Sequence, residues 1–196
     1  MKLEFFFDYG SPYSYLADTR LAGLQARVGC EIAYRPMLLG GIFKATGNRS
    51  PAEETVLPKL RYQSAELQRW VEHYQVGFVS NPFFPINTLQ LMRTAHAAQD
   101  SGVFDTFHPV VFKAMWEQEK NLGDPEVLGP VLESAGLDAP GLLGMAADPE
   151  VKRSLMETSE EAVARGVFGA PTFFVGDAMF FGNDRLDFVE RALMTG

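Results

Sequence analysis

The chain has 196 residues, of which 46% are hydrophobic and 21% are charged, and its formal net charge at pH 7 is −8. This composition is ordinary for a globular protein with an apolar core, and the length suits one domain or a domain with a large insertion. The acidic balance contains no block of five like charges, so we expect no nucleic-acid partner.

Cys30 is the single cysteine, which excludes an intrachain disulfide and a paired-cysteine metal cluster. A small buried side chain is the expected role for this residue. The chain begins directly with an apolar segment, without the pattern of a signal peptide. No apolar run approaches the roughly 18 residues that a membrane helix needs. We therefore expect a soluble, cytoplasmic protein with no membrane partner and no metal site.

The first 36 residues read as strand, helix, strand. An aromatic run at residues 3–7 predicts a buried strand, and the helical pattern that follows Ser14 extends to about Val28, with Gly29 as a stop. Residues 31–35 predict a second strand, which Pro36 closes. This order fits a crossover unit with two parallel strands.

Helical patterns then dominate as far as Arg165. Residues 38–47 are short and punctuated by glycine, and residues 81–85 form a rigid aromatic loop. Helical segments are expected around residues 57–74, 88–100, 107–116, 126–134, 141–146 and 149–165. No repeat or low-complexity segment interrupts the order.

The last 30 residues return to strand patterns. Residues 167–175 are rich in strand-forming side chains, a turn follows at Gly176-Asp177, and residues 178–181 predict another strand. Asn183-Asp184 offers an N-cap for a final helix at residues 185–194.

Two incomplete sheets at opposite ends of the chain can cover their faces only if they join as one four-stranded sheet. The order β-α-β followed by β-β-α is that of the thioredoxin-like α/β fold. We therefore predict a thioredoxin-like domain from residues 1–40 and 166–196, with a large all-helical domain, residues 41–165, inserted in the middle.

Ser11 lies where the first strand gives way to the first helix. Pro12 suits the first helical turn, because its missing N–H costs nothing there. The free backbone N–H groups and the helix dipole favour an anion beside Ser11. A Ser–His–Asp triad is disfavoured, because all three histidines fall in the helical insertion and no Gly-x-Ser-x-Gly motif surrounds Ser11.

The turn Ser11-Pro12-Tyr13-Ser14 occupies the place of the Cys-Pro-X-Cys turn of bacterial disulfide oxidoreductases, but it has no thiol and cannot form a disulfide. The serine version resembles kappa-class glutathione transferases and, more closely, bacterial 2-hydroxychromene-2-carboxylate isomerases. The blocks that carry this resemblance are residues 7–17, 47–48, 67–70, 167–173 and 181–186.

The resemblance implies glutathione as the cofactor, with Ser11 as the catalytic hydrogen-bond donor to its thiolate. Ala170-Pro171 matches the position of the fold's cis-proline and would pair with the cysteinyl part of the tripeptide. Asn183 and Asp184 would bind the γ-glutamyl end. The simpler alternatives are a helix cap at Ser11, a strand-start proline at Pro171, and capping alone at Asn183-Asp184.

The resemblance also implies contacts from Asn48, Lys59 and Tyr62 to the rest of the tripeptide. Lys44 and Phe84 would bind the substrate, as a carboxylate partner and as an aromatic wall. A solvated charge at Lys59 and a packed loop at Phe84 are the simpler alternatives. Glu53 and Glu54 stand where the isomerase pattern has an Asn-Arg pair, so the substrate itself is open.

The function implied by the resemblance is glutathione-dependent cis/trans isomerisation of 2-hydroxychromene-2-carboxylate and trans-o-hydroxybenzylidenepyruvate, in the breakdown of naphthalene-like aromatic hydrocarbons. The partners would be glutathione and a small aromatic 2-oxo acid, and the protein would be a homodimer. One alternative is a kappa-class glutathione transferase that conjugates glutathione to small electrophiles. Another is a binding protein with a thioredoxin fold and no redox activity.

Overall fold

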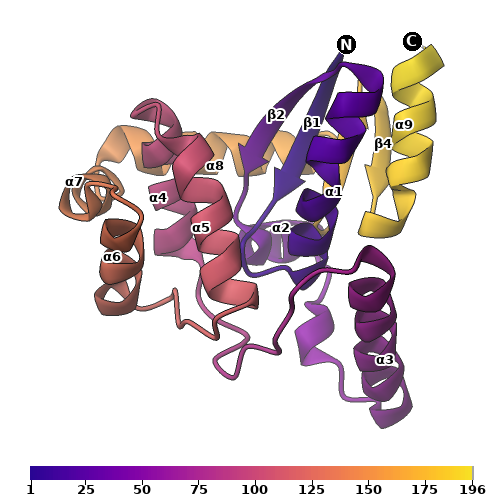
Figure 1. Ribbon diagram of the computed structural model, residues 1–196, viewed down its shortest axis with the longest axis horizontal. Coiled ribbons are helices and arrows are strands. Elements are labelled where there is room, and N and C mark those ends of the chain that lie inside the picture. The colour runs from indigo at the N-terminus through magenta and orange to yellow at the C-terminus, as the bar shows by residue number, and fades with distance from the viewer. Residues whose placement is uncertain (196) are drawn as a thin grey trace.

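The computed structural model describes residues 1–195 of the chain (Figure 1). The strands are β1 (Lys2–Phe7), β2 (Glu31–Pro36), β3 (Thr172–Val175) and β4 (Ala178–Phe181). The α-helices are α1 (Pro12–Val28), α2 (Leu39–Thr46), α3 (Leu57–Tyr74), α4 (Leu89–Asp100), α5 (Phe104–Trp116), α6 (Pro125–Ser134), α7 (Ala139–Met145), α8 (Pro149–Ala164) and α9 (Leu186–Thr195). Short 3₁₀ helices lie at η1 (Pro51–Glu53) and η2 (Asn183–Arg185). No helix within residues 1–195 is long and apolar enough to cross a membrane.

The strands form one four-stranded sheet in the order β2-β1-β3-β4. Strand β1 runs parallel to β2 and antiparallel to β3, and β4 runs antiparallel to β3. At the centre of the sheet Phe5 lies opposite Tyr34 of β2 and Phe173 of β3. The two ends of the chain therefore meet in one sheet, and the predicted thioredoxin-like fold class is confirmed.

Both faces of the sheet are covered by helices. The buried side chains of Leu3, Phe5 and Phe7 belong to the larger core, which also contains apolar residues of α1, α5 and α9. The side chain of Phe6 points to the other face and packs with Ile42 of α2 and residues of α8. This alternation follows from the two-residue period of a strand.

Helices α2 to α8 all lie between β2 and β3 in the chain. Apolar residues of α4, α5, α6, α7 and α8 share one buried cluster with the sheet residues, and Figure 1 shows α4 to α7 grouped beside the sheet. The division into a thioredoxin-like domain and an inserted helical domain at residues 40 and 165 stays a prediction.

One segment without a predicted element is helical, and one predicted strand is shorter than expected. Residues 39–46, which are punctuated by glycine, form helix α2, because tertiary contacts such as the burial of Ile42 outweigh the low helix propensity of glycine. Strand β3 begins only at Thr172, because residues 167–171 form a loop with a cis bond between Ala170 and Pro171.

A group of ion pairs links β1 to the end of α8. Arg165 donates to the Glu4 carboxylate at 2.7 Å and to Glu161 at 3.1 Å, and its guanidinium lies 3.8 Å from the ring centroid of Phe174. Arg35 of β2 contacts both carboxylates. The hydrogen bond from Arg165 is the main cause that lowers the pKa of Glu4 below its usual value.

The lowered pKa of Glu4 predicts an acid-dependent stability. The contribution is fully present above the unfolded pKa of about 4.5 and is lost as the pH falls through the folded pKa. We expect Glu4→Gln to lower the free energy of unfolding by about 1 kcal/mol at pH 7 and by less near pH 3, where Glu4 begins to take up its proton. Urea unfolding at both pH values measures this.

Glu190→Gln is the matched control, because Glu190 pairs with Arg27, whose side chain is 54% exposed. Removal of this solvent-screened pair is expected to change stability much less than Glu4→Gln does. Equal losses for the two variants at pH 7, or a loss for Glu4→Gln that is as large at pH 3 as at pH 7, would contradict the assigned role of Glu4.

Candidate active site

Ser11 lies between β1 and α1, at the N-terminus of the helix. Its backbone is extended (φ −98°, ψ 115°), and its Oγ accepts a hydrogen bond from the Ser14 N–H at 3.1 Å, as an N-cap does. The same hydroxyl donates to the Ala170 carbonyl oxygen at 3.3 Å. That distance is long against about 2.7–2.8 Å for an ordinary O–H···O bond. The hydroxyl proton is therefore open to a stronger acceptor, and Ser11 remains 5% exposed.

The loop before β3 comes to Ser11 from the other end of the chain. The bond between Ala170 and Pro171 is cis, a state that the sequence alone could not give. The Pro171 carbonyl accepts from the Gly182 N–H at 3.0 Å, which ties the loop to the end of β4. The Phe181 ring would lie 2.8 Å from a Cβ atom at Gly169, so the close contact there requires glycine.

Asn48 also contacts this loop. Its Nδ2 donates to the Phe168 carbonyl oxygen at 3.0 Å, and its Oδ1 accepts from the Arg49 N–H at 2.8 Å. The residue is exposed. The structure thus brings Asn48, from the turn after α2, to the loop that carries Ala170 and Pro171.

The Asp8 carboxylate holds the segment before Ser11 in place. Its Oδ1 accepts from the Gly10 N–H at 2.8 Å, and its Oδ2 accepts from the Leu39 N–H and the Thr88 hydroxyl, each at 2.9 Å. Asp8 is 1% exposed. Burial raises the pKa of this carboxyl group, and the three hydrogen bonds oppose that rise. One side chain therefore connects the Ser11 loop to the starts of α2 and α4.

A second network of hydrogen bonds starts at Tyr9, within the core. The Tyr9 hydroxyl and His108 Nδ1 are 2.7 Å apart, and His108 Nε2 is 2.9 Å from Asp18 Oδ1. Burial, and next the Asp18 carboxylate, raise the pKa of Tyr9 well above its usual value, so the phenol keeps its proton in this network. Trp116 Nε1 donates to the Tyr9 carbonyl at 2.8 Å.

These positioning residues were missed by the sequence reasoning. The sequence predicts no role for His108 near Ser11, and it does not mark Trp116, a buried core residue that also donates to Tyr9. The partners of Tyr9 lie 99 and 107 residues away in the chain, and no local pattern marks such a pairing.

The predicted capping role of Asn183-Asp184 was wrong. Gly182 is the N-cap of η2, and no side chain caps it. Asn183 is 4% exposed; its carbonyl accepts from the Tyr74 hydroxyl at 3.0 Å, and its amide reaches the same hydroxyl at 3.5 Å. The Asp184 carboxylate is exposed and pairs with Arg185 at 2.5 Å.

Tyr13 of α1 lies between these residues and α3. Burial is the main cause that raises the pKa of its phenol, and the charges of Glu66, Tyr62 and Asp184 add to the rise. The first turn of α1, helix α3 and η2 therefore surround one region next to Ser11. Figure 1 shows α3 below α9, near the start of α1.

The other predicted residues lie at the surface. Lys59 pairs with Glu54 at 3.3 Å, and its side chain is 66% exposed. Tyr62 is 61% exposed, with the Arg69 guanidinium 5.7 Å from its ring centroid. Glu54 also accepts hydrogen bonds from the N–H groups of Thr55 and Val56 at the start of α3. Lys59 therefore pairs with Glu54, one of the two acids that distinguish this sequence from the expected Asn-Arg pair.

The two residues suggested for the substrate come from different elements. Lys44 is exposed in the last turn of α2, one turn before Asn48. Phe84 is 38% exposed, and its ring centroid lies 5.7 Å from that of Trp116. Within residues 1–195 no group of three His, Cys, Asp or Glu side chains is arranged to hold a metal ion.

The similarities to known proteins agree with this geometry. Residues 2–194 match the DsbA-like thioredoxin domain family. The 2-hydroxychromene-2-carboxylate isomerase of Sphingobium xenophagum is 34% identical over 192 residues, which cover 98% of this chain and 97% of that protein. The chain belongs to the 2-hydroxychromene-2-carboxylate isomerase family.

Two further comparisons place this isomerase-family chain among its relatives. A solved structure of a 2-hydroxychromene-2-carboxylate isomerase superposes with a TM-score of 0.87 at 30% identity, over 98% of this chain and 94% of the other. Human glutathione S-transferase kappa 1 is 30% identical and is matched over 97% of this chain and 90% of its own length. The isomerase family and the kappa class thus share the full length of the chain.

The contact between Gly10 and Thr88 gives a test of the loop's position in this family member. A Cβ atom at residue 10 would lie 2.9 Å from Thr88 Cγ2, so Gly10→Ala must displace the loop that carries Ser11. We expect the catalytic efficiency of Gly10→Ala to fall about tenfold or more. Steady-state kinetics with the isomerase substrate measures this.

The control removes the obstructing methyl group. Thr88→Ser keeps the hydroxyl that donates to Asp8, so this variant alone should retain near-normal activity. Gly10→Ala combined with Thr88→Ser should recover part of the loss. A double variant no better than Gly10→Ala would show that the contact with Thr88 does not set the loop position.

Proposed function

We propose that this protein is a glutathione-dependent isomerase that interconverts 2-hydroxychromene-2-carboxylate and trans-o-hydroxybenzylidenepyruvate. One observation carries the proposal: the Ser11 hydroxyl, at the tip of α1, lies 3.3 Å from the carbonyl group that precedes cis-Pro171. Membership of the isomerase family supports the choice of this reaction.

The groups around Ser11 have the chemistry that a thiol tripeptide needs. A hydroxyl donor and a helix N-terminus stabilise an anion at Ser11. The backbone of Ala170, next to Ser11, could pair with a peptide, and the Asp184 carboxylate suits an ammonium group. The Asn48 amide, next to the same loop, is available to a further polar part of the tripeptide.

When bound, glutathione would supply a thiolate that adds reversibly to the electrophilic carbon of the unsaturated 2-oxo acid, so that the bond can rotate before elimination. Ser11 donates a hydrogen bond to the sulfur anion and lowers the pKa of the thiol. The hydroxyl accepts the Ser14 N–H at the same time, which fixes its orientation. Asp8 keeps this turn in place through its bonds to Leu39 and Thr88.

The small aromatic 2-oxo acid would lie next to Ser11, with Lys44 as the partner of its carboxylate and Phe84 as an aromatic wall. Lys59 and Tyr62 of α3 would border the glutathione side. Glu54, which holds Lys59 at 3.3 Å, is the chain's departure from the isomerase pattern. Because of this departure, the preferred substrate and the type of reaction are two separate questions.

A kappa-class transferase is the second candidate, because human glutathione S-transferase kappa 1 is matched over 97% of this chain. A transferase would use the same Ser11 but would release a conjugate. The two activities differ in whether glutathione is consumed.

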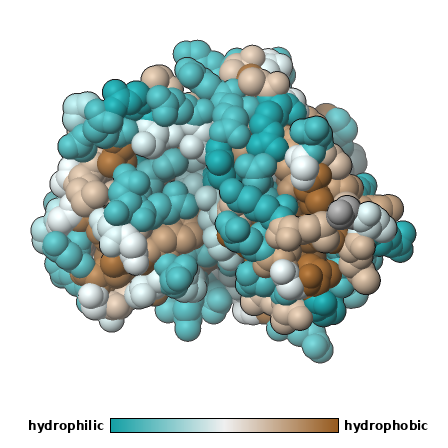
Figure 2. Space-filling view, turned by 90° about the horizontal axis from the view of Figure 1, so that it is seen from above, coloured by the Kyte–Doolittle hydropathy of each residue, from teal (hydrophilic) through white to brown (hydrophobic). Residues whose placement is uncertain are grey.

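The proposal includes a cytoplasmic homodimer that acts in aromatic hydrocarbon breakdown, where cytosolic glutathione is available. Exposed apolar side chains support self-association: Met179 and Phe181 on β4, and Phe188 and Met194 on α9, are 37%, 40%, 50% and 71% exposed. Figure 2 shows apolar patches on the right-hand side of the molecule, where α9 ends. Analytical ultracentrifugation measures the mass in solution.

Ser11→Ala tests the catalytic role. This substitution removes the donor, so the thiol pKa of bound glutathione should rise and kcat/KM should fall about a hundredfold. The thiolate absorbance of the complex as a function of pH, together with isomerase kinetics, measures both effects. The lost cap should lower stability by only about 1 kcal/mol.

Ser14→Ala is the matched control in the same turn. The Ser14 side chain is fully buried, and its Oγ has no hydrogen-bond partner within residues 1–195, so this variant should keep its activity and the thiol pKa. Total glutathione should stay constant through many turnovers of the wild type. Its consumption would indicate the transferase, and binding without turnover would indicate a binding protein.

A further inference from the structure

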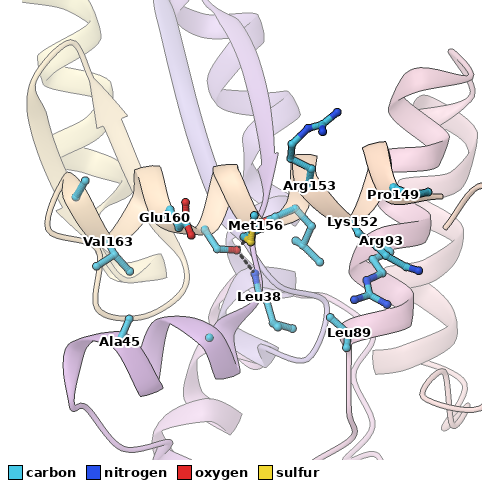
Figure 3. A pocket seen from close by; sticks show the side chains of 14 residues that line it. Leu38, Ala45, Leu89, Arg93, Pro149, Lys152, Arg153, Met156, Glu160 and Val163 are labelled. Carbon is cyan, nitrogen blue, oxygen red and sulfur yellow. Dashed lines mark hydrogen bonds between the residues drawn. The ribbon is translucent and has the colours of Figure 1, made fainter. Parts of the chain in front are cut away.

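A groove lies between α2, α4 and α8, away from Ser11 (Figure 3). Its volume is about 810 Å³, which falls within the range of about 300–1,000 Å³ that small-molecule sites occupy. Ser11, Ala170 and Asn183 do not line it. The groove is therefore a different site from the candidate active site.

The hollow arises because small residues face large ones. Helix α2 contributes Gly41 and Ala45, which are four residues apart and share one face of the helix. Helix α8 runs along the groove and contributes Met156, which is 54% exposed, and Val163, which lies two turns further along the same face. Leu38 and Leu89 complete an apolar wall.

Cations without acidic partners stand at one end of this groove. Arg93 of α4 and Lys152 of α8 both line it, and Figure 3 shows them together, with Glu160 toward the opposite end. Within residues 1–195 no carboxylate lies within 4.0 Å of either cation. The buried Nε atom of Arg93 has no hydrogen-bond partner there. Arg153, by contrast, pairs with Glu150.

Buried guanidinium groups are normally paired, because an unsatisfied charged donor is costly. Arg93 is partly buried, and its buried Nε atom is the one without a partner, so a ligand in the groove could supply the missing acceptor. The guanidinium fork fits a carboxylate, and the apolar wall fits a hydrophobic body.

We propose that this groove binds a small amphipathic carboxylate. The carboxylate pairs with Arg93, with Lys152 adding positive charge, and the apolar part packs on Leu38, Leu89 and Met156. A neutral ligand would leave the Arg93 guanidinium unpaired, and a purely polar anion would leave the apolar wall exposed to water.

The probes are 2-naphthoate and octanoate, with 2-naphthylmethanol as a neutral analogue, titrated by calorimetry into the full chain. The titration is done alone and with saturating S-hexylglutathione, which would occupy the proposed active site. We expect a Kd between about 10 μM and 1 mM for at least one carboxylate. That Kd should be unchanged by S-hexylglutathione, and the alcohol should bind about tenfold more weakly or not at all.

Arg93→Gln should weaken carboxylate binding about tenfold or more. Arg191→Gln removes the same charge from α9, outside the groove, and should leave binding unchanged. The proposal is overturned if neither carboxylate binds, if Arg93→Gln binds as the wild type does, or if S-hexylglutathione abolishes binding.

A second pair of variants changes only exposed side chains. Met156→Glu puts a negative charge on an exposed position of the groove, and Met194→Glu puts the same charge on an exposed position of α9. Only Met156→Glu should weaken binding of 2-naphthoate. If Met156→Glu instead converts a dimer to a monomer in sedimentation, the groove is covered by a second copy, and the carboxylate proposal fails.

These measurements do not depend on glutathione chemistry. If S-hexylglutathione does not bind, the proposed function is at fault, and the titration with 2-naphthoate alone still decides on the groove.

Discussion

The buried carboxylate of Asp8 is the interaction on which the site depends. Its two oxygen atoms accept from Gly10 on one side, and from Leu39 and Thr88 on the other. A buried acid without such partners would be strongly unfavourable. Here the three donors come from the Ser11 loop and from the starts of α2 and α4. The position of the Ser11 hydroxyl is therefore set in part by the starts of α2 and α4, through the Asp8 carboxylate.

The sheet brings the two halves of the site together. Ser11 and Ala170 are 159 residues apart in the chain, yet they share a hydrogen bond, because β1 pairs with β3 at the centre of the sheet. Helix α1 starts at the end of β1, and the cis-proline loop leads into β3. An anion that binds at the tip of α1 therefore meets peptide backbone from the other end of the chain.

Much of this arrangement could be predicted from the sequence, because it depends on local signals. Pro12 and Gly29 mark the bounds of α1, and Asp148-Pro149 marks the start of α8, where the Asp148 side chain caps the helix. The order of the elements then gave the thioredoxin-like fold. The contact of Ser11 with the proline loop followed from the resemblance to a family.

The rest depends on contacts between distant residues. The glycine-rich α2 forms because its start is bound to Asp8 and Ile42 is buried, and glycine propensity alone argues against a helix. Asn183 faces Tyr74, 109 residues away, so it does not cap the helix that follows it. The hydrogen-bond network of Tyr9, His108 and Asp18 also depends on tertiary contacts, because each hydrogen bond joins residues that are 90 or more positions apart in the sequence.

The burial of the single cysteine affects how such an enzyme responds to oxidants. Cys30, the single cysteine, is 4% exposed, and burial raises the pKa of its thiol, which makes it a poor target for oxidants. Oxidative stress would therefore leave this thiol in its reduced form. Under the proposed function it would slow turnover by depleting the reduced tripeptide, and activity would return as soon as that pool is restored.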